Sequence, residues 1–330
     1  MAVSAVCALP LGLPSKNLEV LAGFEAMKLL LLFLDGVGLG ADDPMNNPFA
    51  HAHLPTLNYL LDGQRMLQGI APFENQQVSL LALDACLGVP GLPQSATGQA
   101  TLLTGTNVPA LLGYHYGPKP NPPIAEVLRN GNLFNLLTQR GYRARLLNAY
   151  PPSYFSAIAS RHRIYSAIPL AVTNAGIRLN TAEDLIAGLA ISADFTAQGW
   201  RDRLGIHDAP MLTPHQAGIR LAELALQCDF SLFEYWLSDY VGHKQDMAAA
   251  LALLETLDQV LSGLLSVWNM DQGLILVTSD HGNLEELNTR HHTNNPVPML
   301  VIGSTHLRRT FCSSLSSLTD INPSILSVFP

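Results

Sequence analysis

Three aspartates come shortly after apolar runs of the chain, and histidines lie close to two of them. The aspartates and the runs before them are Asp35 after Leu29–Leu34, Asp239 after Phe230–Leu237, and Asp280 after Leu274–Val277. His243 follows Asp239 by four residues, so one helical turn or a tight loop brings the two side chains together. His281 directly follows Asp280, and His292 lies further along the same region. A mixed set of carboxylates and imidazoles suits Zn²⁺ or Mn²⁺ better than Ca²⁺.

The apolar runs predict the elements that position these side chains. Runs that are continuously apolar, rather than alternating, are typical of strands buried on both faces of a mostly parallel sheet. Helical patterns lie between them at residues 213–228, which open with a Thr-Pro-His-Gln capping box, at 246–268 and at 319–326. Strands alternating with helices predict an α/β fold, a mostly parallel sheet flanked by helices. Such sheets bind ligands at the carboxyl ends of their strands, where the three aspartates fall.

A hydroxyl group in the setting of a nucleophile occurs in the segment Gln-Ser-Ala-Thr-Gly-Gln-Ala-Thr, residues 94–101. The segment follows a turn rich in Pro and Gly and leads into apolar residues, so we expect a loop that enters a helix. Free N–H groups and the helix dipole at such an N-terminus favour a phosphate and an ionised hydroxyl. Ser95 and Thr97 are the two candidates. Without the metal-ligating residues, Ser95 would be interpreted as an ordinary N-cap.

Together these segments resemble the alkaline phosphatase superfamily, most closely its branch of cofactor-independent phosphoglycerate mutase and phosphopentomutase. The resemblance is carried by Phe-Leu-Asp-Gly-Val-Gly at 33–38, Asp-Tyr-Val-Gly-His at 239–243, Thr-Ser-Asp-His-Gly-Asn at 278–283 and His-Thr-x-Asn-x-Val-Pro at 292–298. Each segment alone is also typical of a turn or a helix cap, and only the combination is specific. The resemblance covers residues 28–110 and 213–330 and implies an alkaline-phosphatase-like core.

The resemblance implies two metal ions with separate ligands. The ligand sets are Asp239, His243 and His292 for one metal, and Asp35, Asp280, His281 and Ser95 for the other. His291 competes with His292, but the spacing of the last segment favours His292. In the mutases a Gly and a His follow the nucleophile in the register in which Gly98 and Gln99 follow Ser95. This register selects Ser95 with Thr97 as the alternative, and the role of the family's histidine does not carry over to Gln99.

These observations predict a two-metal phosphoryl-transfer enzyme that acts on a small phosphomonoester through a phosphoserine intermediate. The two divalent ions are expected to be Mn²⁺ or Zn²⁺. Attack on the phosphoserine by water makes the enzyme a phosphatase, and attack by another hydroxyl of the same substrate makes it a phosphomutase. One alternative is a hydrolase of another ester, such as a phosphodiester or phosphonate, on the same core. Another is a catalytically idle member of the superfamily that keeps its metals.

The middle of the chain differs in character from the segments that carry the motifs. Residues 111–212 are richer in Arg, Pro and Gly, with a predicted helix at 132–140 and a predicted strand at 143–147. We predict an inserted, smaller α+β cap domain at 111–212 and a discontinuous catalytic core of residues 28–110 and 213–330. The cap is expected to bind substrate, because arginine suits phosphate and carboxylate groups. Its predicted substrate-binding residues are Arg161, Arg163 and His115.

Composition limits the partners and the compartment. The net charge of −8 over 330 residues disfavours a nucleic-acid partner, so a small phosphorylated metabolite is the expected one. The four cysteines show no metal spacing and predict free thiols in a reducing, cytoplasmic setting. No apolar run of the sequence reaches the roughly 18 residues that span a bilayer, so we expect no membrane partner. Residues 1–27 lack the basic start of a signal peptide and are interpreted as an N-terminal extension.

Overall fold

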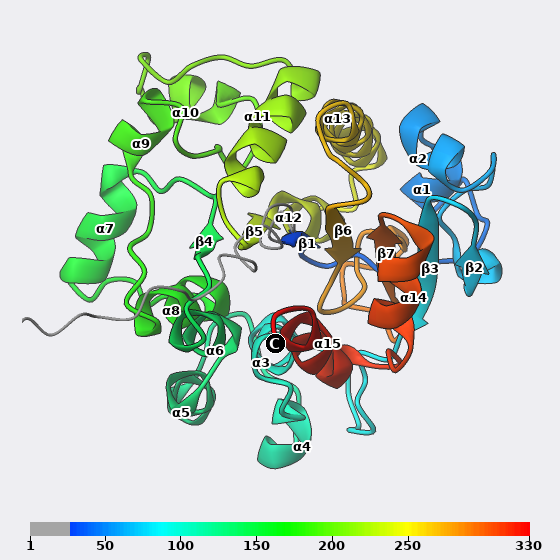
Figure 1. The fold of residues 1–330 in the computed structure, drawn as a ribbon, viewed down its shortest axis with the longest axis horizontal. Coiled ribbons are helices and arrows are strands. Elements are labelled where there is room, and N and C mark those ends of the chain that lie inside the picture. The colour runs from blue at the N-terminus through cyan, green and yellow to red at the C-terminus, as the bar shows by residue number, and fades with distance from the viewer. Residues whose placement is uncertain (1–26) are drawn as a thin grey trace, which may run out of the picture.

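A seven-stranded sheet crosses the middle of the molecule (Figure 1). The structure is a computed structural model that describes residues 27–330, so the predicted N-terminal extension lies outside the described residues except for Met27. In spatial order the strands are β2 (Phe73–Glu74), β3 (Val78–Leu83), β7 (Val297–Ile302), β6 (Gly273–Thr278), β1 (Lys28–Leu34), β5 (Phe230–Tyr235) and β4 (Ala144–Leu146). β6, β1, β5 and β4 run parallel, whereas β7 is antiparallel to β6 and β3, and β2 is antiparallel to β3. The predicted α/β class is thus confirmed, with a mixed and largely parallel sheet.

Helices cover both faces of this sheet, which explains the continuously apolar strands. In β1, Leu30 and Leu32 pack on one side, and Leu29, Leu31 and Phe33 pack on the other. The first face carries α1 (Pro48–His51), α2 (Pro55–Leu60), α11 (Pro214–Leu226) and α13 (Met247–Leu265). The second carries α3 (Ser95–Thr104), α5 (Pro122–Asn130), α6 (Leu133–Gln139), α8 (Ala167–Asn174), α14 (Thr305–Cys312) and α15 (Ile321–Val328). The remaining helical segments are η1 (Gln68–Ile70), α4 (Val108–Leu112), α7 (Pro152–Ala159), α9 (Ala182–Ile186), α10 (Gln198–Asp202), α12 (Leu237–Gly242) and η2 (Leu318–Asp320).

The predicted helix starts agree with the structure. Thr213 and Gln216 form the predicted reciprocal capping box at the start of α11, and Asp246 caps α13 by accepting from the Ala249 N–H. α15 begins at Ile321, within two residues of its predicted start. Local capping chemistry therefore located these helices without knowledge of their tertiary contacts.

The predicted cap domain is not seen as a separate body among residues 27–330. β4 lies inside the segment 111–212, yet it pairs with β5 as the edge strand of the main sheet. α5, α6 and α8 belong to the same segment and pack into the core of the second face. Residues 182–209 form a small apolar cluster together with Ala149, and Trp200 is its largest member. The boundaries predicted for the two parts of the chain remain a prediction.

One described helix, α13, is long and apolar enough to cross a membrane by length and composition alone. It has 19 residues, and 44% of its most apolar window is buried. It lies against α11, α1 and α2 in the first core layer (Figure 1), an arrangement that the core helix of a folded domain also adopts. α13 is not a continuous apolar run, because Glu255 and Asp258 interrupt it, and the absence of a membrane partner remains a prediction.

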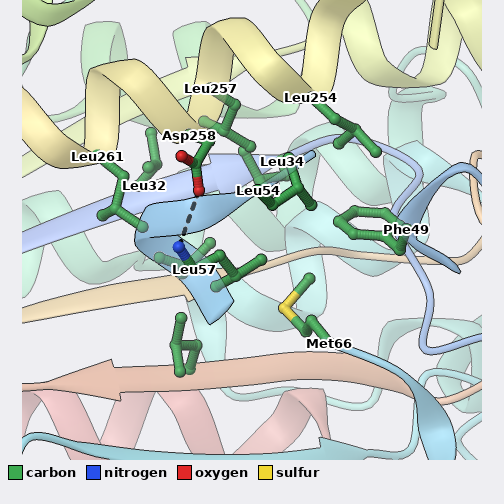
Figure 2. A pocket seen from close by; sticks show the side chains of 12 residues that line it. Leu32, Leu34, Phe49, Leu54, Leu57, Met66, Leu254, Leu257, Asp258 and Leu261 are labelled. Atoms are coloured by element: carbon green, nitrogen blue, oxygen red, sulfur yellow. Dashed lines mark hydrogen bonds between the residues drawn. The ribbon is translucent and has the colours of Figure 1, made fainter. Parts of the chain in front are cut away.

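Asp258 of α13 lines a small apolar cavity and contacts the start of α2 directly (Figure 2). The cavity measures about 30 Å³ and is lined mainly by leucines. The N-cap residue of α2 is Leu54, whose side chain cannot accept a hydrogen bond. The Asp258 carboxylate instead accepts from the N–H groups of Thr56 at 3.1 Å and Leu57 at 2.8 Å. A residue far along the chain thus caps this helix.

Replacing Asp258 with alanine is expected to lower the free energy of unfolding by about 2 kcal/mol, because two N–H groups in an apolar setting lose their acceptor. Urea denaturation of wild type and variant measures the difference. Asp208→Ala, at an exposed position, is the matched control and should change stability little. Equal unfolding midpoints for Asp258→Ala and wild type would show that this cap adds nothing.

Candidate metal centre

The first group of ligand candidates is built on α12 and the loop before β7. Asp239 belongs to α12 and His243 is its C-cap residue, one turn later, with His243 Nε2 at 3.2 Å from Asp239 Oδ2. His292 Nε2 lies 3.7 Å from Asp239 Oδ1 and 3.3 Å from His243 Nε2. The other ring nitrogens face carbonyl groups, His243 Nδ1 at 2.8 Å from Arg290 O and His292 Nδ1 at 2.7 Å from Pro93 O. Because the carbonyl groups engage the Nδ1 atoms, both Nε2 atoms are directed toward Asp239. A histidine that binds a metal through one ring nitrogen is ordinarily held in this way by a hydrogen bond from the other.

The second group gathers where β1, β6 and α3 meet. Asp35 directly follows β1, and Asp280 and His281 come shortly after β6. His281 Nε2 lies 3.4 Å from Asp35 Oδ1, 3.7 Å from Asp280 Oδ2 and 3.0 Å from Ser95 Oγ. Asp239 also offers an oxygen within 4.8 Å of ligand atoms of Asp35 and His281, so the two groups adjoin. The structure thus brings together all seven side chains of the two predicted ligand sets.

The electrostatics of this centre favour a cation. Burial raises the pKa of Asp280, and burial together with the charge of Asp280 raises the pKa of Asp35. Burial acts to lower the pKa of His281, but the carboxylates of Asp280 and Asp35 raise it to about 10. Burial and the nearby His281 lower the pKa of His292 to about 4. Buried carboxylates therefore surround a point that attracts positive charge.

The residues present fit a divalent metal ion. Asp35 Oδ1, Gln99 Oε1 and Asn283 Oδ1 are buried and have no hydrogen-bond partner among the described residues. Unpartnered buried oxygens are costly in a folded protein unless another group satisfies them. The donor set is oxygen and imidazole nitrogen, which both Zn²⁺ and Mn²⁺ accept. The role of each residue as a ligand remains a prediction.

The two candidate nucleophiles have different surroundings. Ser95 is the first residue of α3, after the N-cap Gln94, and its hydroxyl faces His281. The Thr97 hydroxyl is fully buried; it donates to Gln94 O at 3.1 Å and accepts from the Tyr116 N–H at 3.2 Å. Thr97 therefore ties α3 to the loop around Tyr116, and Ser95 is the hydroxyl that adjoins the ligand candidates.

A pocket of about 300 Å³ opens onto this centre. It is lined by Leu92, Gln94, Ser95, Pro118, Asp239, His243, Arg290, His291 and His292. His291, expected to be a bystander to the metals, is an exposed part of this wall. Arg290 was not anticipated from the sequence. Its position next to the two histidines, within a segment already chosen for its motif, was the signal that could have found it.

The predicted substrate-binding residues lie outside the residues that line this pocket. His115 Nε2 contacts Val89 O at 3.2 Å, and burial lowers the pKa of this histidine. Arg163 lies over the ring of Tyr154, 4.7 Å from its centroid. Arg161 is exposed just after α7. A substrate role for these three residues remains a prediction.

Two polar residues that the sequence reasoning did not assign organise the loops of the centre. Asn283 Nδ2 donates to Asp239 Oδ1 at 2.7 Å and so orients this carboxylate. Glu285 is buried and accepts from the N–H groups of Gly38 at 2.9 Å and Asn283 at 2.8 Å. It also accepts from the Thr293 hydroxyl. The loops after β1 and β6 and the segment before β7 are therefore joined through one carboxylate.

Comparison with known sequences supports the centre. A family model for the metalloenzyme superfamily matches residues 216–330, which include Asp239, His243, Asp280, His281 and His292. The 2,3-bisphosphoglycerate-independent phosphoglycerate mutase of Desulforudis audaxviator is 35% identical over 106 residues, which make up 30% of this chain and 20% of the mutase. The corresponding mutase of Legionella pneumophila is 37% identical over 101 residues, 28% of this chain and 19% of the mutase. The matched stretch thus spans only about a fifth of each mutase.

Comparison with solved structures extends over nearly the whole chain and concerns the fold alone. The PH0037 protein from Pyrococcus horikoshii superposes with a TM-score of 0.54 and 14% identity, over 92% of this chain and 96% of that protein. The alkaline phosphatase from the Antarctic bacterium TAB5 gives a TM-score of 0.51 and 12% identity, over 92% and 98% of the chains. Residues 216–330 therefore match the metalloenzyme superfamily, and the chain shows partial homology to cofactor-independent phosphoglycerate mutase, on a fold that resembles that of an alkaline phosphatase.

Proposed function

We propose that this chain transfers the phosphoryl group of a small phosphomonoester through a phosphoserine formed on Ser95. The observation that carries the proposal is the position of the Ser95 hydroxyl, 3.0 Å from His281 Nε2 at the meeting point of two Asp/His groups. The pocket of about 300 Å³ is of the size that small metabolites fill. The N-terminus of α3 adds backbone N–H groups and a dipole that favour a phosphate beside Ser95.

Two divalent cations, Mn²⁺ or Zn²⁺, complete the proposed site. Asp239, His243 and His292 would hold one, and Asp35, Asp280, His281 and Ser95 would hold the other. Bound there, they would supply positive charge that stabilises the attacking and leaving oxygens. Asn283 keeps the Asp239 carboxylate oriented, and the carbonyl groups opposite His243 and His292 fix the orientation of both rings.

In the first proposed step, the Ser95 Oγ–phosphorus bond forms while the bond from phosphorus to the substrate oxygen breaks. The hydroxyl proton of Ser95 passes to solvent, and the departing oxygen takes up one proton from solvent, so no net proton is gained or lost in this step. In the second step, water or a hydroxyl of the same substrate attacks phosphorus and releases Ser95. Water gives a phosphatase, and the substrate hydroxyl gives a phosphomutase.

Product analysis with defined phosphomonoesters tests this proposal. The protein is incubated with Mn²⁺ or Zn²⁺ and with p-nitrophenyl phosphate, ribose 1-phosphate or phosphoglycerate, and free phosphate and isomeric phosphate esters are both measured. Metal-dependent formation of either product is expected, with acid-quenched samples that carry phosphate on Ser95 by mass spectrometry. Absence of metal-dependent turnover together with absence of phosphoserine would refute the proposal.

Arg290 is the proposed contact for an anionic oxygen of the bound substrate, because it is the one arginine that lines the pocket among the described residues. Replacing it with alanine is expected to lower kcat/KM by about ten- to a hundredfold, mainly through KM, since hydrogen bonds to charged groups are strong. Arg290→Lys should recover only part of the loss. Steady-state kinetics measure both, with exposed Arg129→Ala as the control. Unchanged kinetics in Arg290→Ala would remove this residue from the site.

A further inference from the structure

Gln99 lies between the two carboxylates of the Ser95-side group. It sits on α3 one turn after Ser95, so both side chains project from the same face of the helix. Its Nε2 donates to Asp35 Oδ2 at 3.3 Å and to Asp280 Oδ2 at 3.1 Å. The side chain is only 3% exposed, so water does not replace these contacts.

The amide group is suited to this position by its hydrogen-bonding capacity. Ionised carboxylates only accept hydrogen bonds, and the amide NH₂ has two hydrogens, one for each carboxylate. Two buried carboxylates repel each other, and a neutral donor links them without adding charge. Gln99 engages Oδ2 of Asp35, while Oδ1 of the same carboxylate remains unpartnered and faces His281 at 3.4 Å. The oxygen that faces His281 is thus left for the proposed metal.

We infer that Gln99 is a positioning residue that fixes Asp35 and Asp280 as a pair and thereby sets the metal affinity of the Ser95-side site alone. The other site has its own supports, because Asn283 orients Asp239 and the carbonyl of Arg290 orients His243. Gln99 makes no hydrogen bond to any of these residues in the described part of the chain. The inference rests on the proposed metal pair but not on the phosphoryl chemistry.

Calorimetric titration of metal-stripped protein with Mn²⁺ tests this role. His243→Ala removes a ligand of the other site and leaves the Ser95-side site to be measured by itself. In that background, Gln99→Met, which keeps the length of the side chain and removes its donors, is expected to weaken Mn²⁺ binding by about ten- to a hundredfold. Gln99→His keeps one N–H donor, so its Mn²⁺ affinity should lie between that of the His243→Ala parent and that of Gln99→Met. Thr104→Ala, at the far end of α3, is the matched control and should bind as its parent does.

The outcomes separate the inference from the proposed function. If wild type binds no Mn²⁺, the metal pair itself fails. If wild type binds two ions and Gln99→Met binds both with unchanged affinity, the positioning role is overturned. Equal weakening of both sites in Gln99→Met, without the His243 change, would overturn it as well, because a general loss of structure affects both. Restoration of turnover in Gln99→Met by excess Mn²⁺ is the further expected result.

Discussion

Replacing Ser95 with alanine is expected to lower kcat/KM for a phosphomonoester by at least about a thousandfold, because among the described residues Ser95 is the candidate nucleophile whose hydroxyl adjoins the ligand candidates. The Ser95 hydroxyl adjoins His281, whereas the Thr97 hydroxyl is engaged by Gln94 O and the Tyr116 N–H. The measurement is steady-state turnover with saturating Mn²⁺ or Zn²⁺, followed by acid quenching and mass spectrometry of the peptide that contains residue 95. Both the rate and the phosphopeptide should disappear.

Thr97→Val provides the matched control for this experiment. It removes the competing hydroxyl and keeps the shape of the side chain, so the phosphopeptide at Ser95 should remain. Its expected effect is a loss of stability, because the Tyr116 N–H loses its acceptor. If Thr97→Val abolished the phosphoenzyme while Ser95→Ala retained it, the nucleophile would be Thr97. Mn²⁺ titration of both variants shows whether a lost rate reflects lost metal instead.

Much of the fold was predictable because strand burial and helix capping are local properties of the sequence. The run Leu29–Leu34 is apolar at every position, and β1 is indeed covered on both faces. The direction of a strand within the sheet, by contrast, could not be predicted from the local sequence pattern. A continuous apolar run has the same pattern for either strand direction, and β7 is antiparallel to β6 although the connection at residues 279–296 is long enough for a parallel crossover. Parallel neighbours need a long crossover, whereas an antiparallel return does not.

The cap prediction shows the limit of reasoning from composition. Residues 111–212 are rich in Arg, Pro and Gly, and this contrast with the flanking segments suggested a separate body. The three-residue strand β4 nevertheless pairs with β5, since Leu146 and its neighbours complete the sheet edge. Composition reports the solvent exposure of a segment on average. It does not report which few residues of that segment make long-range contacts.

The ligand candidates were predictable because strand ends meet at one edge of the sheet, whatever the loops do. The residues that support these ligand candidates, Gln99 and Glu285, were not predictable from the sequence. Gln99 lies within a helix, and Glu285 lies in a loop, where a polar residue is ordinarily solvated. Only the packing of α3 against the loop at Asp280 makes Gln99 a donor to two carboxylates. Such roles depend on distances between elements that are far apart in the chain.

Glu234 is a second buried carboxyl near the centre that the sequence did not single out. It belongs to β5 and is 5% exposed, and Asn148 holds its backbone by accepting from its N–H and donating to its carbonyl, both at 2.8 Å. Burial and the charge of Asp280 raise the pKa of Glu234 from 4.5 to about 7. The folded protein therefore retains a proton on Glu234 over a pH range in which the unfolded chain releases it.

The sign of the effect on stability follows from this difference. Below pH 4.5 both states carry the proton, and the favourable contribution of neutral Glu234 is complete. As the pH rises from 4.5 to about 7 that contribution is lost, because the unfolded chain ionises freely while the folded protein keeps the proton, and above 7 it must bury a charged carboxylate. Glu234→Gln, which is neutral at every pH, is expected to match wild type near pH 4. Above pH 8 it should exceed wild type in free energy of unfolding by about 3 kcal/mol.

Urea denaturation of metal-stripped protein between pH 4 and 9 measures this difference. A chelator is required, because a cation bound near Asp280 would itself lower the pKa of Glu234. The wild-type curve minus the Glu234→Gln curve then reports the ionisation of Glu234 together with its coupling to Asp280. Glu126→Gln, at an exposed position, should give a curve parallel to wild type. Parallel curves for Glu234→Gln as well would mean that Glu234 is ionised in the folded protein at pH 5, and that nearby positive charge outweighs its burial.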